Sequence, residues 1–404
     1  MMPAKTRAAA GLRIGVDGAC WSNRRGYGRY TRSLLAALAR LDGAGERYSL
    51  FLDQETARQC DLPASFERVI VRTAQPPAQA ASADGHRGIG DLLRMTRAVT
   101  RTQPDVFLFP SVYTFFPIVG RVRAVVTIHD VIAERHPEMI FPRRDLALFW
   151  RMKVGLAVRQ AHLIITVSEH AREGILERFH LAPERVRVVL EAPDAIFRPI
   201  AQPRDPAILL PACRLTPGGR YLLYVGGLSP HKNIETLIEA YRRLLSGGGF
   251  ESLRLLLVGD YTEDVFHSAY ADLRALVERH GLTDRVCFTG FVSDDVVAEL
   301  YNRAEVLIQP SLEEGFGLPA VEAAACGTPV VASEVGPAAS LVGEGVWTFS
   351  PRDVGALTEG LRTLLNDPAR RAAMGMAGRL RVAGLGWDRT AAQVLEALRE
   401  VAAR

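Results

Sequence analysis

Short apolar runs alternate with helix-patterned segments along most of this 404-residue chain, and this alternation constrains the fold more than any other feature. The runs at 12–16 and 221–225 each lead into a loop that contains glycine, and an amphipathic segment follows each loop. Strands and helices that alternate through short connections form parallel sheets with helices packed on both faces. The sequence therefore predicts an α/β protein built from doubly wound parallel sheets.

A segment rich in proline and glycine at 193–220 divides the alternation into two halves. Such a composition is typical of an interdomain linker, and a chain of this length exceeds one ordinary core. We predict a first domain at 1–205, a second at 206–386, and a terminal helix within 387–404 that lies back across the first domain. The predicted strands are 12–16, 48–52, 68–72, 106–109, 123–128, 163–167 and 185–189, then 221–225, 253–258, 285–289, 306–308, 329–332 and 346–349.

Charge and hydrophobicity exclude several classes of protein. The 49 basic and 45 acidic residues are spread along the chain, so the net charge of +4 does not indicate a nucleic-acid partner. A run of about 18 apolar residues is absent, which excludes a transmembrane helix, and no secretory signal is recognised. The chain has five cysteines, Cys20, Cys60, Cys213, Cys287 and Cys326. Because their number is odd and no CxxC spacing occurs, we expect reduced thiols in a cytoplasmic protein.

Two further segments indicate surface features. The segment at 73–90 is rich in Pro, Ala, Gln, Ser and Gly, and we expect a mobile loop of the kind that shapes an acceptor site. The predicted helix at 142–159 mixes five basic residues with leucines and aromatic residues. A basic amphipathic helix can contact anionic lipid at the inner membrane surface. A solvated helix face is the more common origin of such a pattern, and the sequence leaves both interpretations open.

Glu314 and Glu322 flank the point where an apolar strand gives way to a helix. Between them Gly315 and Gly317 form a turn, and an alanine-rich segment follows as far as Gly327. Glycines let a ligand approach the backbone, and the first amides of a helix favour anions, phosphate above all. Carboxylates beside a phosphate site can accept hydrogen bonds from sugar and ribose hydroxyls. We therefore interpret 308–323 as a nucleotide-sugar cradle; the alternative is a solvated loop and a carboxylate that only complements the helix dipole.

Other loops of the second half are expected to reach the same place. Lys232 lies in the loop 226–233, which begins with glycines, and Gly290, Phe291 and Val292 follow a later strand. Parallel strands bring such loops to one edge of the sheet. A lysine beside a helix N-terminus can stabilise the charge that develops on a departing diphosphate. Taken alone, Lys232 is equally well explained as a surface lysine, and the nearby cradle favours the functional role.

In the first half, a glycine loop follows the first strand. It contains Gly26, Tyr27, Gly28 and Arg29, and a helix is expected from about residue 30 to 41. Because Thr31 stands where a GxGxxG fingerprint has its third glycine, a dinucleotide site is not supported. A ligand-binding loop and a simple glycine turn both remain as interpretations.

His129 follows directly after the apolar run at 123–128. A parallel strand delivers the side chains at its carboxyl end to a crevice, so this position is typical of a functional residue. A hydrogen-bonded structural histidine has the same sequence signature, and both interpretations stay open.

Together these motifs resemble those of family 4 glycosyltransferases ("glycosyl transferases group 1") of the GT-B fold, over almost the whole chain. The most specific element is the E-x7-E signature, which Glu314 and Glu322 satisfy between Pro310-Ser311 and residues 327–330. Further matches lie at 26–30, 129–130, 166–169, 226–233, 258–260 and 289–292. The resemblance implies two Rossmann-like domains that face each other across a cleft.

The resemblance also implies roles for individual residues. The first glutamate and the loop after it would hold the donor sugar, the second glutamate would bind the ribose, the lysine would bind the diphosphate, and the strand-end histidine would lie near the anomeric carbon. The catalytic candidates are then His129, Lys232 and Glu314. The donor-binding candidates are Gly227, Lys232, Gly290, Phe291, Val292, Glu314, Gly315, Phe316, Gly317, Leu318 and Glu322, and the acceptor-side candidates are Gly26, Tyr27, Gly28 and Arg29.

The chain departs from the family at the diphosphate clamp. Many members carry an arginine shortly before the lysine, whereas here the preceding positions include Gly227 and His231. Either the loop alone suffices, or His231, Arg29 or Arg303 supplies the second positive charge.

The implied reaction is a retaining transfer by front-face displacement, with no metal and no other cofactor. The donor would be GDP-mannose, as in bacterial mannosyltransferases of surface polysaccharide synthesis, with UDP-sugars as the alternative. The acceptor would be a saccharide or a lipid-linked molecule. A nucleotide-sugar epimerase of the GT-B fold and an inactive nucleotide-sugar binding protein are the competing functions.

Overall fold

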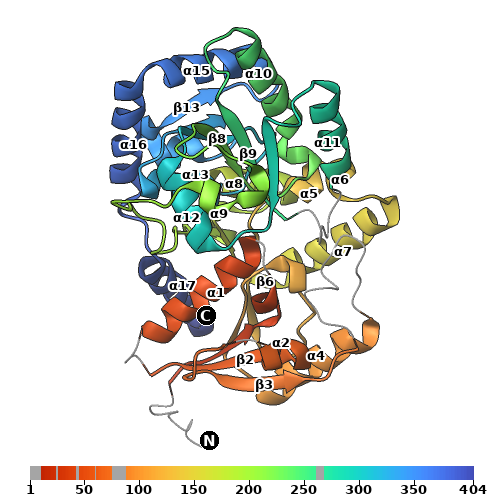
Figure 1. The fold of residues 1–404 in the computed structure, drawn as a ribbon. Helices are drawn as coiled ribbons and strands as arrows, with labels where there is room; N and C mark the ends of the chain where they lie inside the picture. Colours follow the sequence, from red (N-terminus) through yellow and green to blue (C-terminus); the bar gives the residue numbers. More distant parts are fainter. Residues whose placement is uncertain (1–10, 24–25, 42–44, 60, 75–87, 261–267) are drawn as a thin grey trace, which may run out of the picture.

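The computed structural model describes residues 11–23, 26–41, 45–59, 61–74, 88–260 and 268–404. Two parallel sheets form two lobes, red to yellow-green and green to blue in Figure 1. The predicted α/β architecture with two Rossmann-like domains is confirmed. No helix in these ranges is both long enough and apolar enough to cross a bilayer.

The first sheet has the order β3-β2-β1-β4-β5-β6-β7, and its neighbouring strands pair in parallel. The order reverses between β1 and β4, and a crevice forms at such a switch point, outside the carboxyl ends of the strands. The strands are β1 (Arg13–Asp17), β2 (Arg47–Asp53), β3 (Glu67–Val71), β4 (Val106–Phe109), β5 (Arg123–Thr127), β6 (Ala161–Thr166) and β7 (Val186–Val188).

The second sheet has the order β10-β9-β8-β11-β12-β13 and is also parallel. Its switch point lies between β8 and β11, so the loops that leave these two strands meet at the crevice. These are the loops that carry Lys232 and Glu314. The strands are β8 (Tyr221–Val225), β9 (Arg254–Val258), β10 (Val286–Gly290), β11 (Val306–Gln309), β12 (Val330–Ser333) and β13 (Val346–Phe349).

Helices cover both faces of the first sheet because successive strand residues point to opposite sides. Leu108 and Val125 pack in the core beneath α1 (Gly26–Arg40) and α17 (Trp387–Ala403). Phe107 and Val126 pack on the other side, with α4 (Ile89–Thr102) and α7 (Arg144–Gln160). The remaining helices of this lobe are α2 (Gln54–Gln59), α5 (Ile132–Arg135), α6 (Pro137–Ile140) and α8 (Glu169–Phe179).

The second sheet is covered in the same way. Its helices are α10 (Ile234–Ser246), α11 (Tyr270–Arg279) and α15 (Val354–Asn366) on one face, and α12 (Asp294–Arg303), α13 (Leu318–Cys326) and α14 (Ala338–Val342) on the other, with α16 (Pro368–Val382) beyond α13 and α14. The linker contains α9 (Pro206–Leu209) and a 3-10 turn, η4 (Pro211–Cys213).

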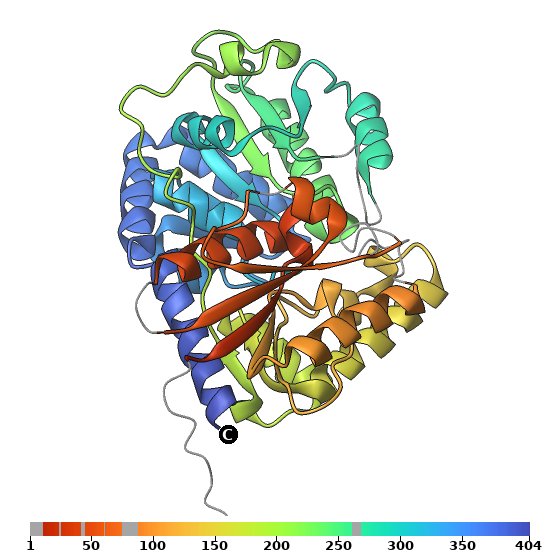
Figure 2. The same ribbon diagram turned by 90° about the horizontal axis from the view of Figure 1, so that it is seen from below.

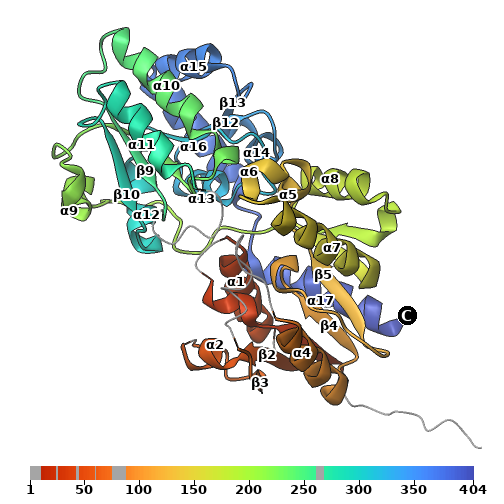
Figure 3. The ribbon, with the colours of Figure 1, turned by 90° about the vertical axis from the view of Figure 1, so that its right-hand side faces the viewer.

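The C-terminal helix α17 returns to the first domain. It packs against α1 and against β4, β5 and β6. The hydroxyl of Thr390 donates to the Leu190 carbonyl at 2.7 Å, and the Arg123 guanidinium donates to the Ala402 carbonyl at 2.6 Å. Figure 2 shows the helix in blue along the side of the red-to-yellow domain, and Figure 3 shows its end among first-domain elements.

The structure corrects several local predictions. Helix α1 begins at Gly26, not near residue 30, and Gly290 ends β10 instead of opening the loop after it. Helix α4 begins at Ile89, inside the segment expected to be a loop, and residues 75–87 of that segment lie outside the described residues. The strands predicted at 221–225 and 346–349 are confirmed.

The prediction that the thiols are reduced is wrong for one pair. Cys213 and Cys287 form a disulfide, with their Cα atoms 5.5 Å apart. The turn η4 of the linker lies against β10, and this contact brings together two cysteines that are 74 positions apart in sequence. Cys20 and Cys326 are buried and are not disulfide-bonded, and Cys60 lies outside the described residues.

Candidate active site

The cradle forms where β11 ends and α13 begins. Gly317, the N-cap residue of α13, has φ +80°, a left-handed conformation that a side chain would strain. A Cβ atom there would also lie 3.0 Å from the Gln309 side-chain nitrogen. Pro319 has no N–H, and the Ala320 and Val321 amides donate to the Gly317 carbonyl at 3.0 and 3.4 Å, so Leu318 supplies the amide that this end of α13 can offer to a ligand. The positive end of the helix dipole thus faces the crevice, as an anion site requires.

Glu314 is joined to Lys232 at the start of this cradle. The Lys232 Nζ atom lies 2.6 Å from Glu314 Oε1, and the Ser311 hydroxyl donates to the same oxygen at 2.7 Å. Burial by itself raises the pKa of Glu314, but the charge and hydrogen bonds of its neighbours, Lys232 foremost, outweigh burial and hold the pKa below its ordinary value. A carboxylate and an ammonium group therefore stand side by side, both charged, at the switch point of the second sheet.

Glu322 lies one turn inside α13, and its side chain is almost fully buried. Arg29 of the first domain approaches its Oε1 atom to 2.7 Å, and the Tyr301 hydroxyl donates to Oε2 at 3.2 Å. Burial raises the pKa of Glu322 to about 7, with Arg29 opposing the rise and Asp294 adding to it. The carboxyl group predicted to bind ribose is therefore poised between its neutral and charged forms near neutral pH.

His129 lies at the carboxyl end of β5 and is held through both ring nitrogens. Nδ1 lies 3.2 Å from Glu191 Oε1, Nε2 lies 3.2 Å from the Pro110 carbonyl oxygen, and the edge of Tyr30 packs at a centroid distance of 4.7 Å. Neighbouring Asp130 has a raised pKa because of burial. These contacts fix the ring orientation and present the backbone of residues 129–130 to the second domain.

Gly315 is the point where the cradle touches the first domain. A Cβ atom at this position would lie 2.5 Å from the carbonyl oxygen of His129, so only glycine allows the approach. The Ser168 hydroxyl, at the N-cap of α8, donates to the Gly315 carbonyl at 2.5 Å. The structure thus brings His129, Lys232 and Glu314 to one boundary between the domains.

The four acceptor-side candidates lie in a different type of element from the one predicted. Gly26, Tyr27, Gly28 and Arg29 form the first turn of α1, not a loop. Tyr27 is buried and stacks on Tyr113 at 4.7 Å. Because a Cβ atom at position 28 would lie 1.9 Å from the Asn23 carbonyl oxygen, this glycine serves close packing. Of the four, Arg29 is the residue whose side chain reaches the cradle.

The donor-side candidates outside the cradle lie at the strand ends nearby. The Gly227 carbonyl accepts a hydrogen bond from the Tyr224 hydroxyl, and Gly290, with φ +73°, accepts one from the Gly259 amide. Phe291 is 56% exposed and Val292 is partly buried. Phe316 is buried beneath the cradle, and Leu318 opens α13.

Two of the three residues considered as a second diphosphate cation do not fit that role. His231 is partly buried next to Lys232, and desolvation foremost lowers its pKa to about 3, so the ring is neutral. Arg303 points to the linker, where it donates to the Pro203 carbonyl. Arg29 is in the site, but in this structure it binds Glu322 and lies 3.5 Å from Asp294.

Sequence reasoning missed Glu313. Its side chain is buried, and it contacts two first-domain residues: Arg135 Nη1 at 2.7 Å and His136 Nε2 at 3.2 Å. The pair Glu313-Glu314 has no pattern that separates a solvated carboxylate from an interdomain one. The distinction depends on how the domains face each other, which local sequence does not encode.

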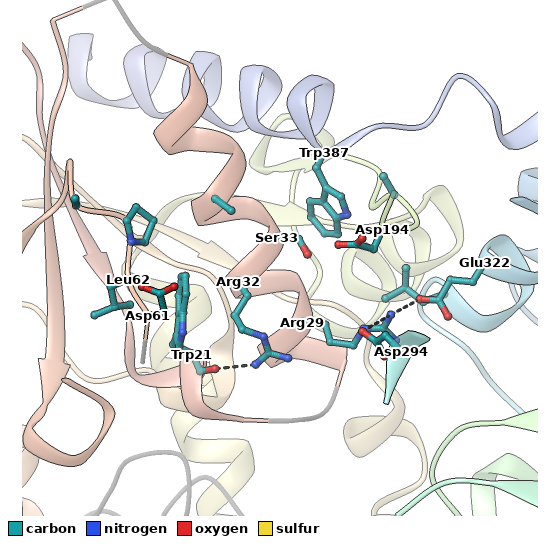
Figure 4. Close-up of a pocket in the computed structure, with 15 residues that line it drawn as sticks. Trp21, Arg29, Arg32, Ser33, Asp61, Leu62, Asp194, Asp294, Glu322 and Trp387 are labelled. Atoms are coloured by element: carbon teal, nitrogen blue, oxygen red, sulfur yellow. Dashed lines mark hydrogen bonds and ion pairs between the residues drawn. The ribbon is translucent and has the colours of Figure 1, made fainter. Parts of the chain in front are cut away.

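A cavity of about 590 Å³ opens between the domains beside the Arg29–Glu322 ion pair (Figure 4). Trp21 and Arg32 line its first-domain side, Trp387 its C-terminal side, and Asp294 and Glu322 its second-domain side. Its size and mixture of aromatic and charged groups suit a polar organic ligand. Within the described ranges, no group of three or more His, Cys, Asp or Glu residues gathers as a metal site would require, and independence from metals stays a prediction.

Family comparisons match both halves of the chain. The model described as "Glycosyltransferase Family 4" matches residues 24–192, and the model described as "Glycosyl transferases group 1" matches residues 214–381. The first matched region contains His129, which follows β5, and the second contains the whole cradle.

Curated relatives are glycosyltransferases of bacteria. The O-antigen chain mannosyltransferase B of Escherichia coli is 31% identical over 280 residues, which cover 68% of this chain and 70% of that protein. The MMP alpha-(1->4)-mannosyltransferase of Mycolicibacterium hassiacum is 31% identical over 72% of this chain and 66% of its own length. A D-inositol 3-phosphate glycosyltransferase of an Arthrobacter species is 34% identical over 50% of this chain and 46% of its own length. The matches thus span from about half to seven tenths of these relatives.

Solved structures show the same fold over nearly the whole chain. A sucrose-phosphate synthase from Thermosynechococcus elongatus aligns over 97% of this chain and 99% of its own, with a TM-score of 0.75 and 23% identity. The Anabaena protein HepE, solved in complex with UDP and glucose, aligns over 96% of this chain and 100% of its own, with a TM-score of 0.71 and 19% identity.

Proposed function

The chain belongs to the group 1, family 4 glycosyltransferases, and from this premise we propose that it transfers mannose from GDP-mannose, with retention of configuration, to a saccharide or lipid-linked acceptor in surface polysaccharide synthesis. The contact between Lys232 and Glu314 at the N-terminus of α13 carries the proposal. It places a cation for a leaving diphosphate next to a carboxylate that can accept sugar hydroxyl hydrogen bonds.

The donor is proposed to lie along the cradle. Its diphosphate would replace part of the Glu314 contact on Lys232 and would accept a hydrogen bond from the Leu318 amide at the start of α13. The hexose would lie on Glu314, and the ribose hydroxyls would donate to Glu322, at the edge of the cavity described above. In that arrangement Arg29 must share Glu322 with the ribose or leave it.

The proposed reaction is a front-face displacement. The bond from the anomeric carbon to the diphosphate oxygen breaks, the acceptor oxygen forms its bond to the same face of that carbon, and the acceptor proton passes to the departing diphosphate. Lys232 and the α13 dipole stabilise the charge that develops on the diphosphate. His129, held through both ring nitrogens, would shape the first-domain side of the reacting centre.

The choice of GDP-mannose rests on relatives. Two of the curated relatives above are mannosyltransferases by name, whereas the HepE structure holds UDP, which keeps a UDP-sugar as the second candidate donor. A thermal-shift panel of GDP-, UDP- and ADP-sugars tests the donor. We expect the largest rise in Tm with GDP-mannose, because a ligand that binds only the folded state stabilises it. Stabilisation by none of them, or by NAD instead, contradicts the donor site.

The same panel with an activity readout separates the competing functions. An epimerase of this fold converts or hydrolyses the nucleotide sugar without an acceptor, and an inactive binding protein is stabilised by the donor but never turns it over. A transferase releases nucleoside diphosphate at a rate that depends on an added acceptor.

A lipid-linked acceptor requires contact with a membrane, and α7 offers a surface for it. Its outward side exposes Leu148 (58%), Phe149 (41%), Met152 (67%) and Leu156 (39%). These residues recur at helical spacing and form one stripe, and exposed arginines flank it at 143, 144, 151 and 159. Apolar side chains rimmed by arginine complement an anionic bilayer surface.

We propose that α7 rests on the cytoplasmic face of the inner membrane. The disulfide between Cys213 and Cys287 does not favour that compartment.

Co-sedimentation with lipid vesicles tests the α7 surface. The protein is expected to bind vesicles that contain phosphatidylglycerol and not pure phosphatidylcholine vesicles. The double variant Phe149→Ser, Met152→Ser should lose about 10-fold or more in binding. The matched control is Met376→Ser, Leu380→Ser on α16, which exposes 62% and 68% of those side chains. Equal losses in both double variants contradict the proposal.

A further inference from the structure

Glu313 is a buried carboxylate of the second domain whose ion-pair partners belong to the first. Arg135, the last residue of α5, approaches Glu313 Oε1 to 2.7 Å, and His136 approaches Oε2 to 3.2 Å. Only 6% of the Glu313 side chain is exposed. A charge so far removed from water is costly unless partners hold it, so this contact favours the arrangement in which the two domains meet.

The guanidinium of Arg135 also has an exposed partner within the first domain. Its Nη2 atom lies 2.5 Å from Glu177 Oε2 on α8, while Nη1 contacts Glu313. Glu177 is 75% exposed, in contrast to Glu313. The same guanidinium thus joins one exposed carboxylate of its own domain and one buried carboxylate of the other.

The partners of Glu313 lie on the same segment as His129. His129 ends the β5 region, α5 follows at 132–135, and His136 comes next. On the other side of the boundary, Glu313 directly precedes Glu314. Two further contacts join the domains near the Glu313 ion pair. The Gly315 backbone lies against the His129 carbonyl, and α6 contacts the 3-10 turn η5 (Pro230–Lys232).

We propose that Glu313, Arg135 and His136 form a clamp that sets the position of His129 relative to Glu314, which makes Glu313 a positioning residue for sugar transfer. This inference rests on the proposed function of the cradle. The proposed donor contacts of Lys232 and α13 all lie within the second domain, so donor binding does not need the clamp. Transfer does need it, because the reacting centre includes the first-domain segment that the clamp holds.

The substitution Glu313→Gln tests this role. The amide keeps the size of the side chain and loses its charge. We expect kcat to fall about 10- to 100-fold, the size of effect that follows a misplacement of reacting groups by about 1 Å. The Kd for GDP-mannose, measured by calorimetry, should stay within about threefold of the wild-type value. Small-angle scattering should show a larger radius of gyration for the variant.

Two further variants separate the clamp from a general structural role. Glu177→Gln removes the exposed partner of Arg135 and should leave kcat within about twofold of wild type, since surface ion pairs contribute little. The charge exchange Glu313→Arg with Arg135→Glu should recover part of the rate that either single change loses.

The outcomes distinguish the clamp from the function on which it rests. Wild-type protein that transfers no sugar from any nucleotide donor overturns the proposed function. An active wild type with an equally active Glu313→Gln variant overturns the clamp, and so does a variant that loses donor affinity as strongly as kcat, or a charge exchange that recovers nothing.

Discussion

The substitution Lys232→Met examines the Lys232–Glu314 contact, because methionine keeps most of the side-chain length and removes the charge. In the folded protein the lysine ammonium lies 2.6 Å from a carboxylate, and the two side chains are 20% and 15% exposed. The variant leaves Glu314 with the Ser311 hydroxyl as a hydrogen-bond donor and without a neighbouring cation. We therefore expect two separate effects, one on stability and one on the rate.

The stability effect follows from the partial burial of the pair. Exposed ion pairs contribute up to about 1 kcal/mol, and removing one partner of a buried pair costs about 3–5 kcal/mol. Because this pair is partly exposed and Ser311 remains, we expect a loss of about 2 kcal/mol. For a domain of this size that lowers Tm by about 4–8 °C.

The pKa of Glu314 is lowered in the wild type, so its contribution to stability is present above the ordinary pKa and is lost as the pH falls through the lowered pKa. In the variant the pKa of Glu314 should rise, because burial then acts without the opposing charge of Lys232, so this acid-induced loss of stability should become smaller.

The rate effect follows from the charge on the leaving group. Removing one preorganised donor from such a site costs about 10²- to 10³-fold in kcat, or about 2.7–4 kcal/mol. The assay is release of nucleoside diphosphate from GDP-mannose in the presence of an acceptor, below the Tm of the variant. Lys232→Arg is the control, because it keeps the charge and should lose less. A Lys232→Met variant with kcat within threefold of wild type refutes the assignment of Lys232 to the leaving diphosphate.

Three other predictions concern the same site. Glu314→Ala should abolish turnover, because the carboxylate proposed to hold the hexose is gone; unchanged activity in the same assay contradicts this role. The affinity for GDP should rise between about pH 6 and pH 8 in calorimetry, because Glu322, with a pKa of about 7, ionises over that range and then accepts hydrogen bonds from ribose. Glu322→Gln should remove this pH dependence, and a flat wild-type profile argues against the ribose contact. Turnover should be unchanged by EDTA; a loss that added Mg²⁺ restores shows that the reaction needs a metal.

The sequence is a good guide to the strands and to the loops that leave them. Buried parallel strands are short continuous apolar runs, so β4 and β8 could be predicted to the residue. The meeting of Lys232 with Glu314 follows from the same rule, since parallel strands place their exit loops at one edge. The ion pair between the two side chains was not part of that prediction, and it comes from the structure.

Glycine was a poorer guide. Gly26 and Gly28 were interpreted as a loop because glycine is a weak helix former. In the structure Gly28 lies in the first turn of α1, where the Asn23 carbonyl leaves no room for a Cβ atom. Close packing and loop formation favour the same residue, and the sequence pattern does not distinguish the two.

Contacts between the domains could not be predicted from local sequence. Arg29 meets Glu322 and Arg135 meets Glu313 across separations of 293 and 178 residues. These pairs depend on how two separately folded sheets face each other. The disulfide between Cys213 and Cys287 depends in the same way on where the linker crosses the edge strand.

The most direct test of the donor site is a crystal structure of the protein with GDP-mannose. We predict that the diphosphate lies between Lys232 and the Leu318 amide at the start of α13, the hexose on Glu314, and the ribose on Glu322, with Arg29 shifted to share or release that carboxylate. A nucleotide bound elsewhere, with the contacts of Lys232 and Arg29 to the two glutamates unchanged, contradicts the account.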